Sequence, residues 1–600
     1  MKEEVILGIH GFSYGHPRQM HDAGVCIVSE GEVLAAIDEE RLTRAKRDGR
    51  FPMNAYYAAL KEAGIGPDEI TGVAFSDRRS FWQTYWVWRY AIGAFFLTGV
   101  MPLRYLAWWN HIMVQFSRHP PPDISAKKVN FYEHHRCHAA SAYYSSPWEK
   151  ATVVTLDGMG DFSIGGSVYS GKKGELRLMH RSNGYFSPGH FYMIVTEYLG
   201  FIPGRHEGKV TGLAGHGNPE KAYHTMERII SYRKGKLEFV AGPVAEEFFY
   251  LIRGKSGTRT RNWYSQDKCL SEETGSQNVP TRHSGENLRF FRSLWKDYSR
   301  EDIAAAAQKR LEDVVSSYVG DAIKLVRETS LVVAGGTFAN VQLNQRLREL
   351  SEVSNIYIHP NMSDGGLSLG AAMLMHHNLR ESAGIIYTQK PLSHVYLGTG
   401  YSESLIEKVL KDTDSKFSKP LNITEVVAEA LATNKIVAVF RGRMEYGPRA
   451  LGNRSILVSA TDKNTHNNLN NRLNRSEIMP FAPIIMEDYA HEWLLDWDST
   501  HIASRFMTMT YNMNKELAKR VPATVHVDGT VRPQVVSRND NPIIYDILRH
   551  YNDLVGIPLV INTSFNMHEE PIVCSPQDAI QTFRRGASDI MLMGPFLVES

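Results

Sequence analysis

The stretch ATVVTLDGMGDFSIGGSVYSGKKGELRLMH, residues 151–180, has a pattern that recurs in residues 5–37, VILGIHGFSYGHPRQMHDAGVCIVSEGEVLAAI. Each begins with a short apolar strand, Ala151–Leu156 in one and Val5–Ile9 in the other, and continues into an acidic loop that contains glycine. Each then ends in two more strands that a tight turn joins. A unit that occurs twice in this order predicts two similar α/β lobes.

The loops after these strands supply candidate catalytic residues. His21 and Asp22 lie in the earlier loop and Asp157 in the later one, and lobes of this kind close over a nucleotide in actin-like ATPases and sugar kinases. A further loop, Gly335-Gly336, follows the apolar run 331–334 and leads to Asn340. Paired glycines let backbone N–H groups approach an anion, although they serve as a simple strand-to-helix turn at least as often.

The composition is that of a soluble globular protein with more than one domain. Among 600 residues, 67 lysines and arginines nearly balance 65 aspartates and glutamates, which disfavours a large surface for nucleic acid. Four scattered cysteines and an acidic N-terminus without a secretory segment favour the cytoplasm.

An aromatic segment, residues 81–116, contains five of the ten tryptophans and an uncharged run between Arg89 and Arg104. The run is shorter than the ~20 apolar residues that cross a bilayer, so we expect no membrane anchor. A buried helical pair is the favoured interpretation, and a part in an acceptor site or a subunit contact is the alternative.

A metal site is indicated by His134 and His138. The two are four residues apart before an alanine-rich run, so on a helix both imidazoles share one face and can reach one ion. Histidines that hydrogen-bond to neighbouring carbonyls are the alternative. Asp364, in a glycine-rich loop, offers a third ligand and favours the metal.

The sequence pattern of the second half of the chain predicts an anion pocket rich in arginine. We expect one domain over residues 1–385 and another over 400–600, with a loosened segment between them. Arginines among glycines after a strand are typical of phosphate binding, because the guanidinium fork matches phosphate oxygens. The residues expected to line this pocket are Arg441, Arg449, Arg454, Arg475, His526, Arg532, Asn562, Ser564 and Asn566.

Several motifs together resemble one family. They are a His-Asp-Ala loop at 21–23, His-x-x-x-His-Ala at 134–139, Glu-Gly-Lys-Val at 207–210, Ser-Asp-Gly-Gly at 363–366, Glu-Tyr-Gly-Pro-Arg-Ala-Leu-Gly-Asn-Arg-Ser at 445–455, Pro-Phe-Ala-Pro at 480–483, His-Val-Asp-Gly-Thr at 526–530 and Asn-Thr-Ser-Phe-Asn at 562–566. From about residue 5 to about residue 598 the chain resembles the O-carbamoyltransferases of nodulation and antibiotic biosynthesis, which include the nodulation-factor, cephamycin and tobramycin enzymes.

This resemblance implies a fold and a mechanism. The first domain would be duplicated, actin-like and similar to the tRNA threonylcarbamoyladenosine transferase, and the second would be a YrdC-like α/β domain. The second would make carbamoyl-adenylate from carbamoyl phosphate and ATP with Mg²⁺. The first would transfer the carbamoyl group to a small-molecule acceptor beside Fe²⁺, or another divalent metal, on His134, His138 and Asp364. Lys209 joins the expected nucleotide-binding residues.

Some features depart from the family and leave alternatives open. The loop before His21 is longer than usual, residues 81–116 look unlike the better-known members, and Met479 stands where many relatives carry arginine. A tRNA-modifying enzyme, an actin-fold small-molecule kinase and a nucleotide-binding regulatory protein are the competing hypotheses. The acceptor, the choice between oxygen and nitrogen, and the oligomeric state, a homodimer included, stay open.

Overall fold

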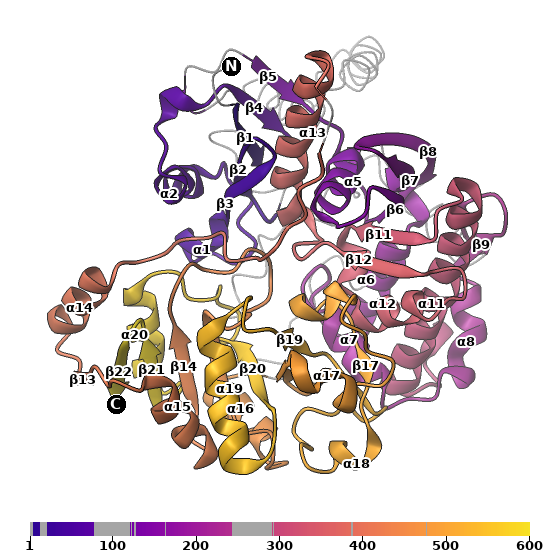
Figure 1. Cartoon of the computed structure of the whole chain (residues 1–600). Helices are drawn as coiled ribbons and strands as arrows, with labels where there is room; N and C mark the ends of the chain where they lie inside the picture. The colour runs from indigo at the N-terminus through magenta and orange to yellow at the C-terminus, as the bar shows by residue number, and fades with distance from the viewer. Residues whose placement is uncertain are drawn as a thin grey trace, which may run out of the picture.

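A computed structural model describes residues 4–11, 21–76, 121, 123–124, 128–161, 164–242, 291, 293–385, 388–475 and 477–599 (Figure 1). The aromatic segment 81–116 and the polar stretch 253–288 lie outside these ranges. Within them, no helix combines the length and the apolar character that crossing a bilayer requires.

Two sheets in the first half share one strand order. The sheet at the N-terminus runs β3-β2-β1-β4-β5, and the next sheet runs β8-β7-β6-β11-β12 in the matching direction. In each, three antiparallel strands come first in the chain and two parallel strands extend the sheet from the first of them. The repeat predicted from the sequence is therefore present in the topology. The strands are β1 (Val5–His10), β2 (Gly24–Ser29), β3 (Glu32–Asp38), β4 (Gly72–Phe75), β5 (Lys128–Phe131), β6 (Lys150–Leu156), β7 (Ile164–Lys172), β8 (Glu175–Asn183), β11 (Ser330–Ala334) and β12 (Asn355–Ile358).

Two helices join the lobes. In Figure 1, α13 (Leu367–Ser382) stands between the β1 sheet and α5 (His134–Ser145). Glycines allow this close packing, because a Cβ on Gly8 would lie 2.0 Å from the Ser368 carbonyl oxygen, and one on Gly370 would lie 1.9 Å from that of Cys137. The other helices of this half are α1 (Glu39–Thr43), α2 (Met53–Ala63), α6 (Pro188–Tyr198), α7 (Glu207–Ala214), α8 (Pro219–Glu227), α11 (Arg300–Val326) and α12 (Val341–Arg348), with a small hairpin of β9 (Ile230–Arg233) and β10 (Glu238–Ala241).

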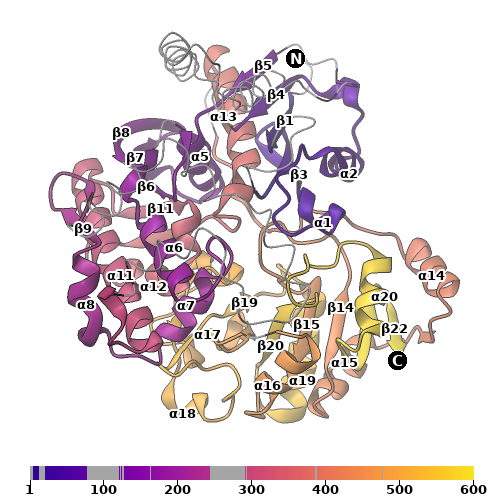
Figure 2. The same cartoon turned by 180° about the vertical axis from the view of Figure 1, so that it is seen from behind.

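The second half is built on a mixed sheet of eight strands, in the order β13-β22-β21-β14-β15-β20-β16-β19. Turned by 180°, the molecule shows α7 of the first half beside this sheet's β19 end (Figure 2). The strands are β13 (Phe417–Ser418), β14 (Val437–Phe440), β15 (Arg454–Val458), β16 (Ala482–Met486), β19 (Gln534–Val536), β20 (Leu559–Ser564), β21 (Ile590–Met593) and β22 (Phe596–Glu599), with β17 (Tyr511–Asn512) and β18 (Thr530–Val531) pairing apart. The helices are α14 (Glu403–Asp412), α15 (Ile423–Ala432), α16 (Thr465–Arg472), α17 (Glu487–Trp493), α18 (Lys515–Ala518), α19 (Pro542–Val555) and α20 (Pro576–Arg584). The predicted α/β class is confirmed as a mixed α/β architecture.

Candidate functional site

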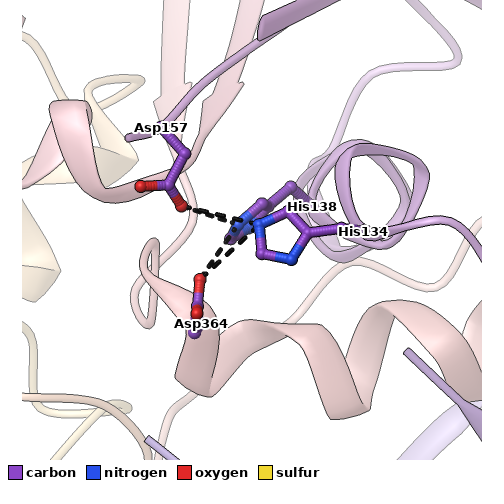
Figure 3. Close-up of side chains that lie close together, drawn as sticks. All are labelled: His134, His138, Asp157 and Asp364. Atoms are coloured by element: carbon purple, nitrogen blue, oxygen red, sulfur yellow. Dashed lines mark hydrogen bonds and ion pairs between the residues drawn. The ribbon is translucent and has the colours of Figure 1, made fainter. Parts of the chain in front are cut away.

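Two histidines and two aspartates converge where the lobes meet (Figure 3). His134 and His138 lie one turn apart on α5, Asp157 follows β6, and Asp364 opens the short 3₁₀ turn Asp364–Gly366 before α13. The Nε2 atom of His138 lies 3.2 Å from Asp157 Oδ2 and 3.5 Å from Asp364 Oδ1. For His134 Nε2, both corresponding distances are 3.7 Å.

This geometry fits a divalent metal ion. Ligands at about 2.1 Å from a tetrahedral ion lie about 3.4 Å from one another, close to the four His–Asp distances of 3.2 to 3.7 Å, and all four atoms lie within 4.8 Å of one another. His134 Nε2 and Asp364 Oδ1 are also buried without a hydrogen-bond partner among the described residues. A buried polar atom left without a partner is costly, and coordination to a cation would satisfy both.

The ionisable side chains of the cluster shift one another's pKa values. Although burial opposes its ionisation, the two histidines hold the pKa of Asp157 well below its usual range. Burial disfavours a charged His134, but Asp364 and Asp157 outweigh it and raise the pKa of His134 to about 10. Without an ion, a protonated His134 therefore lies beside the two carboxylates, and a divalent cation would take over the role of its proton.

The predicted catalytic residues His21 and Asp22 lie at the edge of this cluster. His21 Nδ1 is 3.0 Å from Asp22 Oδ2 and 3.6 Å from Asp364 Oδ2. Burial and Arg47 oppose protonation of His21, but Asp364 and Asp22 raise its pKa overall. The backbone of Asp22 is left-handed, with φ of 60°. Strained backbone of this kind often holds a side chain at a functional site.

Asp157 differs from its expected place. We predicted it as a catalytic residue separate from a three-residue metal set, whereas its carboxylate lies with His134, His138 and Asp364 as a fourth candidate ligand. Gly336 borders the same cluster, because a Cβ there would lie 3.1 Å from Asp157 Oδ1. Gly335, with φ of 109°, instead allows the turn to pass the end of β6.

A second group of charges lies in the C-terminal half. Arg449 and Arg532 each have a buried Nε atom with no hydrogen bond within the described part of the chain. Burial and the neighbouring Arg449 lower the pKa of Arg532 to about 9, and Glu477 opposes this shift. Two adjacent buried cations repel each other, so the pair is suited to an anion.

Three other expected pocket residues come together around Arg475, whose pKa Glu477 affects as it affects those of Arg449 and Arg532. The Arg475 guanidinium donates to the Ser564 hydroxyl at 3.1 Å and to Asn566 Oδ1 at 2.9 Å. The first half of the chain approaches here as well, because His526 Nε2 lies 3.1 Å from the carbonyl oxygen of Gly212 in α7. Lys209, on the same helix, is buried. Arg441 is half-buried in the loop after β14.

Some predicted pocket residues hold the protein itself together. Arg454 is fully buried over the Phe440 ring and donates to the carbonyl oxygens of Arg441, Thr399 and Gly442. Asn340 accepts from the Leu343 N–H as the cap of α12, and Asn562 donates to the Ala450 carbonyl. Internal hydrogen bonds satisfy most of the polar atoms of these three residues, and their contact with a ligand stays a prediction.

The sequence reasoning also missed basic residues near both groups. Arg47 Nε lies 3.5 Å from Asp22 Oδ1. Burial lowers the pKa of Lys46, and Glu569 and Arg475 both lie close enough to affect it. The signal was present as Arg41, Arg44, Lys46 and Arg47 directly after β3. A solvated helix end carries such charges equally often, so the pattern alone could not decide.

Known proteins match the chain along most of its length. Residues 6–373 match the family described as Carbamoyltransferase N-terminus, and residues 428–600 match Carbamoyltransferase C-terminus. The chain belongs to the carbamoyltransferase family. Membership in this family makes it a transferase of carbamoyl groups.

Relatives at moderate identity support the assignment. The nodulation protein NolNO of Sinorhizobium fredii is 28% identical, over 97% of this chain and 79% of that protein. An uncharacterized protein of Methanocaldococcus jannaschii is 30% identical, over 96% and 98%. The (R)-2-hydroxyglutaryl-CoA dehydratase component A of Acidaminococcus fermentans aligns structurally over 62% of this chain and 98% of that one, at 13% identity and a TM-score of 0.32, which is too weak a likeness to support an argument.

Proposed function

We propose that the carbamoyltransferase works in two half-reactions at its two charged sites. The C-terminal site would form carbamoyl-adenylate from carbamoyl phosphate and ATP, and the site between the lobes would transfer the carbamoyl group to a hydroxyl or amine of a small-molecule acceptor. The observation that carries the proposal is the presence, in one chain, of two half-buried arginines whose Nε atoms have no partner among the described residues and of a separate His–Asp cluster.

The first half-reaction needs an anion site. Water would cleave carbamoyl phosphate to carbamate and phosphate, and a carbamate oxygen would then attack the α-phosphorus of ATP and release pyrophosphate. Arg449 and Arg532 would neutralise the charge of the phosphate oxygens. The hydrogen bonds from Arg475 to Ser564 and Asn566 would orient its guanidinium group toward the anion. ATP would bring Mg²⁺, and Lys209 on α7 would approach the nucleotide from the other domain.

The second half-reaction would take place beside His134, His138, Asp157 and Asp364. There the acceptor oxygen or nitrogen would attack the carbamoyl carbon, and AMP would leave. A divalent metal such as Fe²⁺ would supply Lewis-acid polarisation when bound. His21, hydrogen-bonded to Asp22, would take the acceptor proton.

The products distinguish this proposal from its rivals. Purified protein with carbamoyl phosphate, ATP and a library of hydroxyl and amino acceptors should yield AMP, pyrophosphate and one acceptor heavier by a carbamoyl unit, as read by mass spectrometry. ADP in place of AMP would identify a kinase. Salt-sensitive retention of bulk tRNA on filters, with carbamoylation of no small molecule, would favour a tRNA-modifying enzyme.

A further inference from the structure

The loop that carries Arg449 is internally rigid. In this arginine loop, residues 445–454, the Glu445 carboxylate is buried and its Oε1 atom accepts the backbone N–H groups of Leu451, Asn453 and Arg454 at 2.8 to 3.1 Å. One carboxylate therefore closes the whole loop. These three hydrogen bonds favour movement of the loop as a unit when an anion binds at Arg449.

One end of the arginine loop enters the first domain. Tyr446 is 3% exposed, and its hydroxyl lies 3.1 Å from His359 Nε2 and 3.5 Å from the carbonyl oxygen of Gly365. Gly365 directly follows the cluster residue Asp364. The next loop residue, Gly447, has φ of 104°, and a Cβ there would lie 3.1 Å from the Pro360 carbonyl oxygen, so the two loops are packed backbone to backbone.

His359 passes this contact to the helix of the other metal-binding residues. Its Nδ1 atom lies 3.1 Å from the Oγ atom of Ser145. Ser145 is the last residue of α5, the helix that carries His134 and His138. Ser145 Oγ donates to a carbonyl oxygen of the preceding turn, so it accepts from His359 Nδ1–H. His359 Nε2 is then free to accept from the Tyr446 hydroxyl. Burial lowers the pKa of His359 to about 3, which keeps the ring neutral and suits it to one donated and one accepted bond.

The imidazole of His359 also sets the position of the loop before α13. A Cβ on Gly366 would lie 3.0 Å from its Cδ2 atom, so ring and loop are in contact. A shift of Tyr446 therefore reaches both halves of the cluster, through the 361–366 loop to Asp364 and through Ser145 to the two histidines.

We propose that Tyr446 is a positioning residue that couples the arginine loop to the metal cluster through His359. An anion bound at Arg449 then changes the affinity of His134, His138, Asp157 and Asp364 for a metal ion. The inference rests on the proposed function only for the identity of the anion. Coupling between two sites is reciprocal, so the metal would change anion affinity by the same factor.

Cobalt binding tests the coupling without turnover. Co²⁺ would be titrated into the full-length, metal-stripped protein and followed by its visible absorption, with and without saturating carbamoyl phosphate. We expect the two wild-type dissociation constants to differ by at least three-fold. In Tyr446→Phe we expect the dissociation constant to rise by about ten-fold, as for other residues that orient metal ligands, and the effect of carbamoyl phosphate to disappear.

Tyr318→Phe is the matched control. Tyr318, in α11, is 0% exposed, and its hydroxyl lies 3.0 Å from Ser182 Oγ in β8. The substitution therefore removes a hydrogen-bonded hydroxyl from a buried tyrosine ring, as Tyr446→Phe does. The control should retain wild-type cobalt affinity and coupling, with both variants folded by thermal unfolding. An unchanged cobalt affinity in Tyr446→Phe would overturn the coupling. Equal wild-type dissociation constants for Co²⁺ with and without carbamoyl phosphate would overturn it as well. Failure of the proposed function would appear separately, as absence of AMP and pyrophosphate from the wild type.

Discussion

Asp38, at the end of β3, is a carboxyl group kept neutral by its surroundings. Burial raises its pKa to about 8, Arg41 opposes the shift, and Glu40 and Asp22 add to it. The folded protein therefore binds this proton at pH values where the unfolded chain, with an ordinary pKa of about 4, has lost it. The contribution of Asp38 to the free energy of unfolding is therefore most favourable at low pH. It becomes less favourable as the pH rises from about 4 to about 8.

Asp38→Asn should remove this pH dependence, because the amide has no proton to lose. Relative to the variant, the wild type should lose about 1–3 kcal/mol of stability between pH 5 and pH 8, a range reduced for partial exposure. Calorimetric melting of both proteins across that window measures the difference. A wild type that gains stability over the variant as the pH rises would mean that Asp38 is ionised in the folded state.

Residue types and spacing predicted part of the candidate site. His134 and His138 were predicted on one helical face, and both Nε2 atoms lie within 3.7 Å of Asp364 Oδ1. Asp157 follows a strand and precedes a glycine, a pattern equally typical of a phosphate loop. Its place beside His138, 19 residues earlier in the chain, depends on a tertiary contact that spacing does not encode. Arg454 could not be told from Arg449 for a similar reason, since carbonyl oxygens distant in sequence accept its protons.

At the level of elements, the cluster depends on the close approach of α5 and α13. The Cys137 carbonyl, between the two histidines, faces Gly370, and a Cβ there would lie 1.9 Å from its oxygen. The two strand units could be read from alternating apolar runs and turns. This helix contact could not, because a glycine inside a helical pattern indicates a close approach without naming the partner.

Gly370→Ala should push α13 away from α5 and separate Asp364 from the histidines. Alanine normally stabilises a helix over glycine by about 0.5–1 kcal/mol, but overpacking here should cost about 1–3 kcal/mol. We expect a lower melting temperature together with at least ten-fold weaker Co²⁺ binding. Gly320→Ala in α11, whose Cβ would meet only the Glu352 carboxylate at 3.8 Å, should be neutral or stabilising and leave Co²⁺ binding intact. Equal melting temperatures for the two variants would show that the helices have room to adjust.

In the whole molecule, β3 and the segment after it connect the two halves. Arg41 donates to the Gly447 carbonyl oxygen, Arg44 donates to that of Ile572, and the Ala36 N–H donates to that of Leu397. The division into residues 1–385 and 400–600 is a prediction that composition suggested. The way the halves face each other could not be predicted, because it depends on hydrogen bonds between residues more than 350 positions apart.

This arrangement leads to a prediction about two variants, each of which should lose one half-reaction. Arg449→Ala should lower carbamoyl-phosphate-dependent exchange of pyrophosphate into ATP by at least ten-fold, because it removes a charge-assisted contact of about 1.5–3 kcal/mol. His138→Ala should retain that exchange but lose metal and acceptor carbamoylation, since loss of one protein ligand weakens a metal site strongly. Each variant would thus lack one half-reaction.

Mixing the two variants asks whether the carbamoyl-adenylate passes between the sites inside one chain. Arg47 contacts Asp22, and its neighbour Lys46 lies near Arg475, so basic side chains of one short segment reach toward both sites. An anionic intermediate should stay close to these charges, because a cleft lined by one sign of charge concentrates the opposite sign.

We therefore expect an equimolar mixture, assayed at once to prevent exchange of subunits, to carbamoylate the acceptor at no more than a few per cent of the wild-type rate. A mixture that recovers a large part of that rate would show that the intermediate escapes to solvent and is captured by a second molecule. Rates measured over a ten-fold range of protein concentration separate the two cases, since capture from solvent depends on the concentration of the partner and passage within one chain does not.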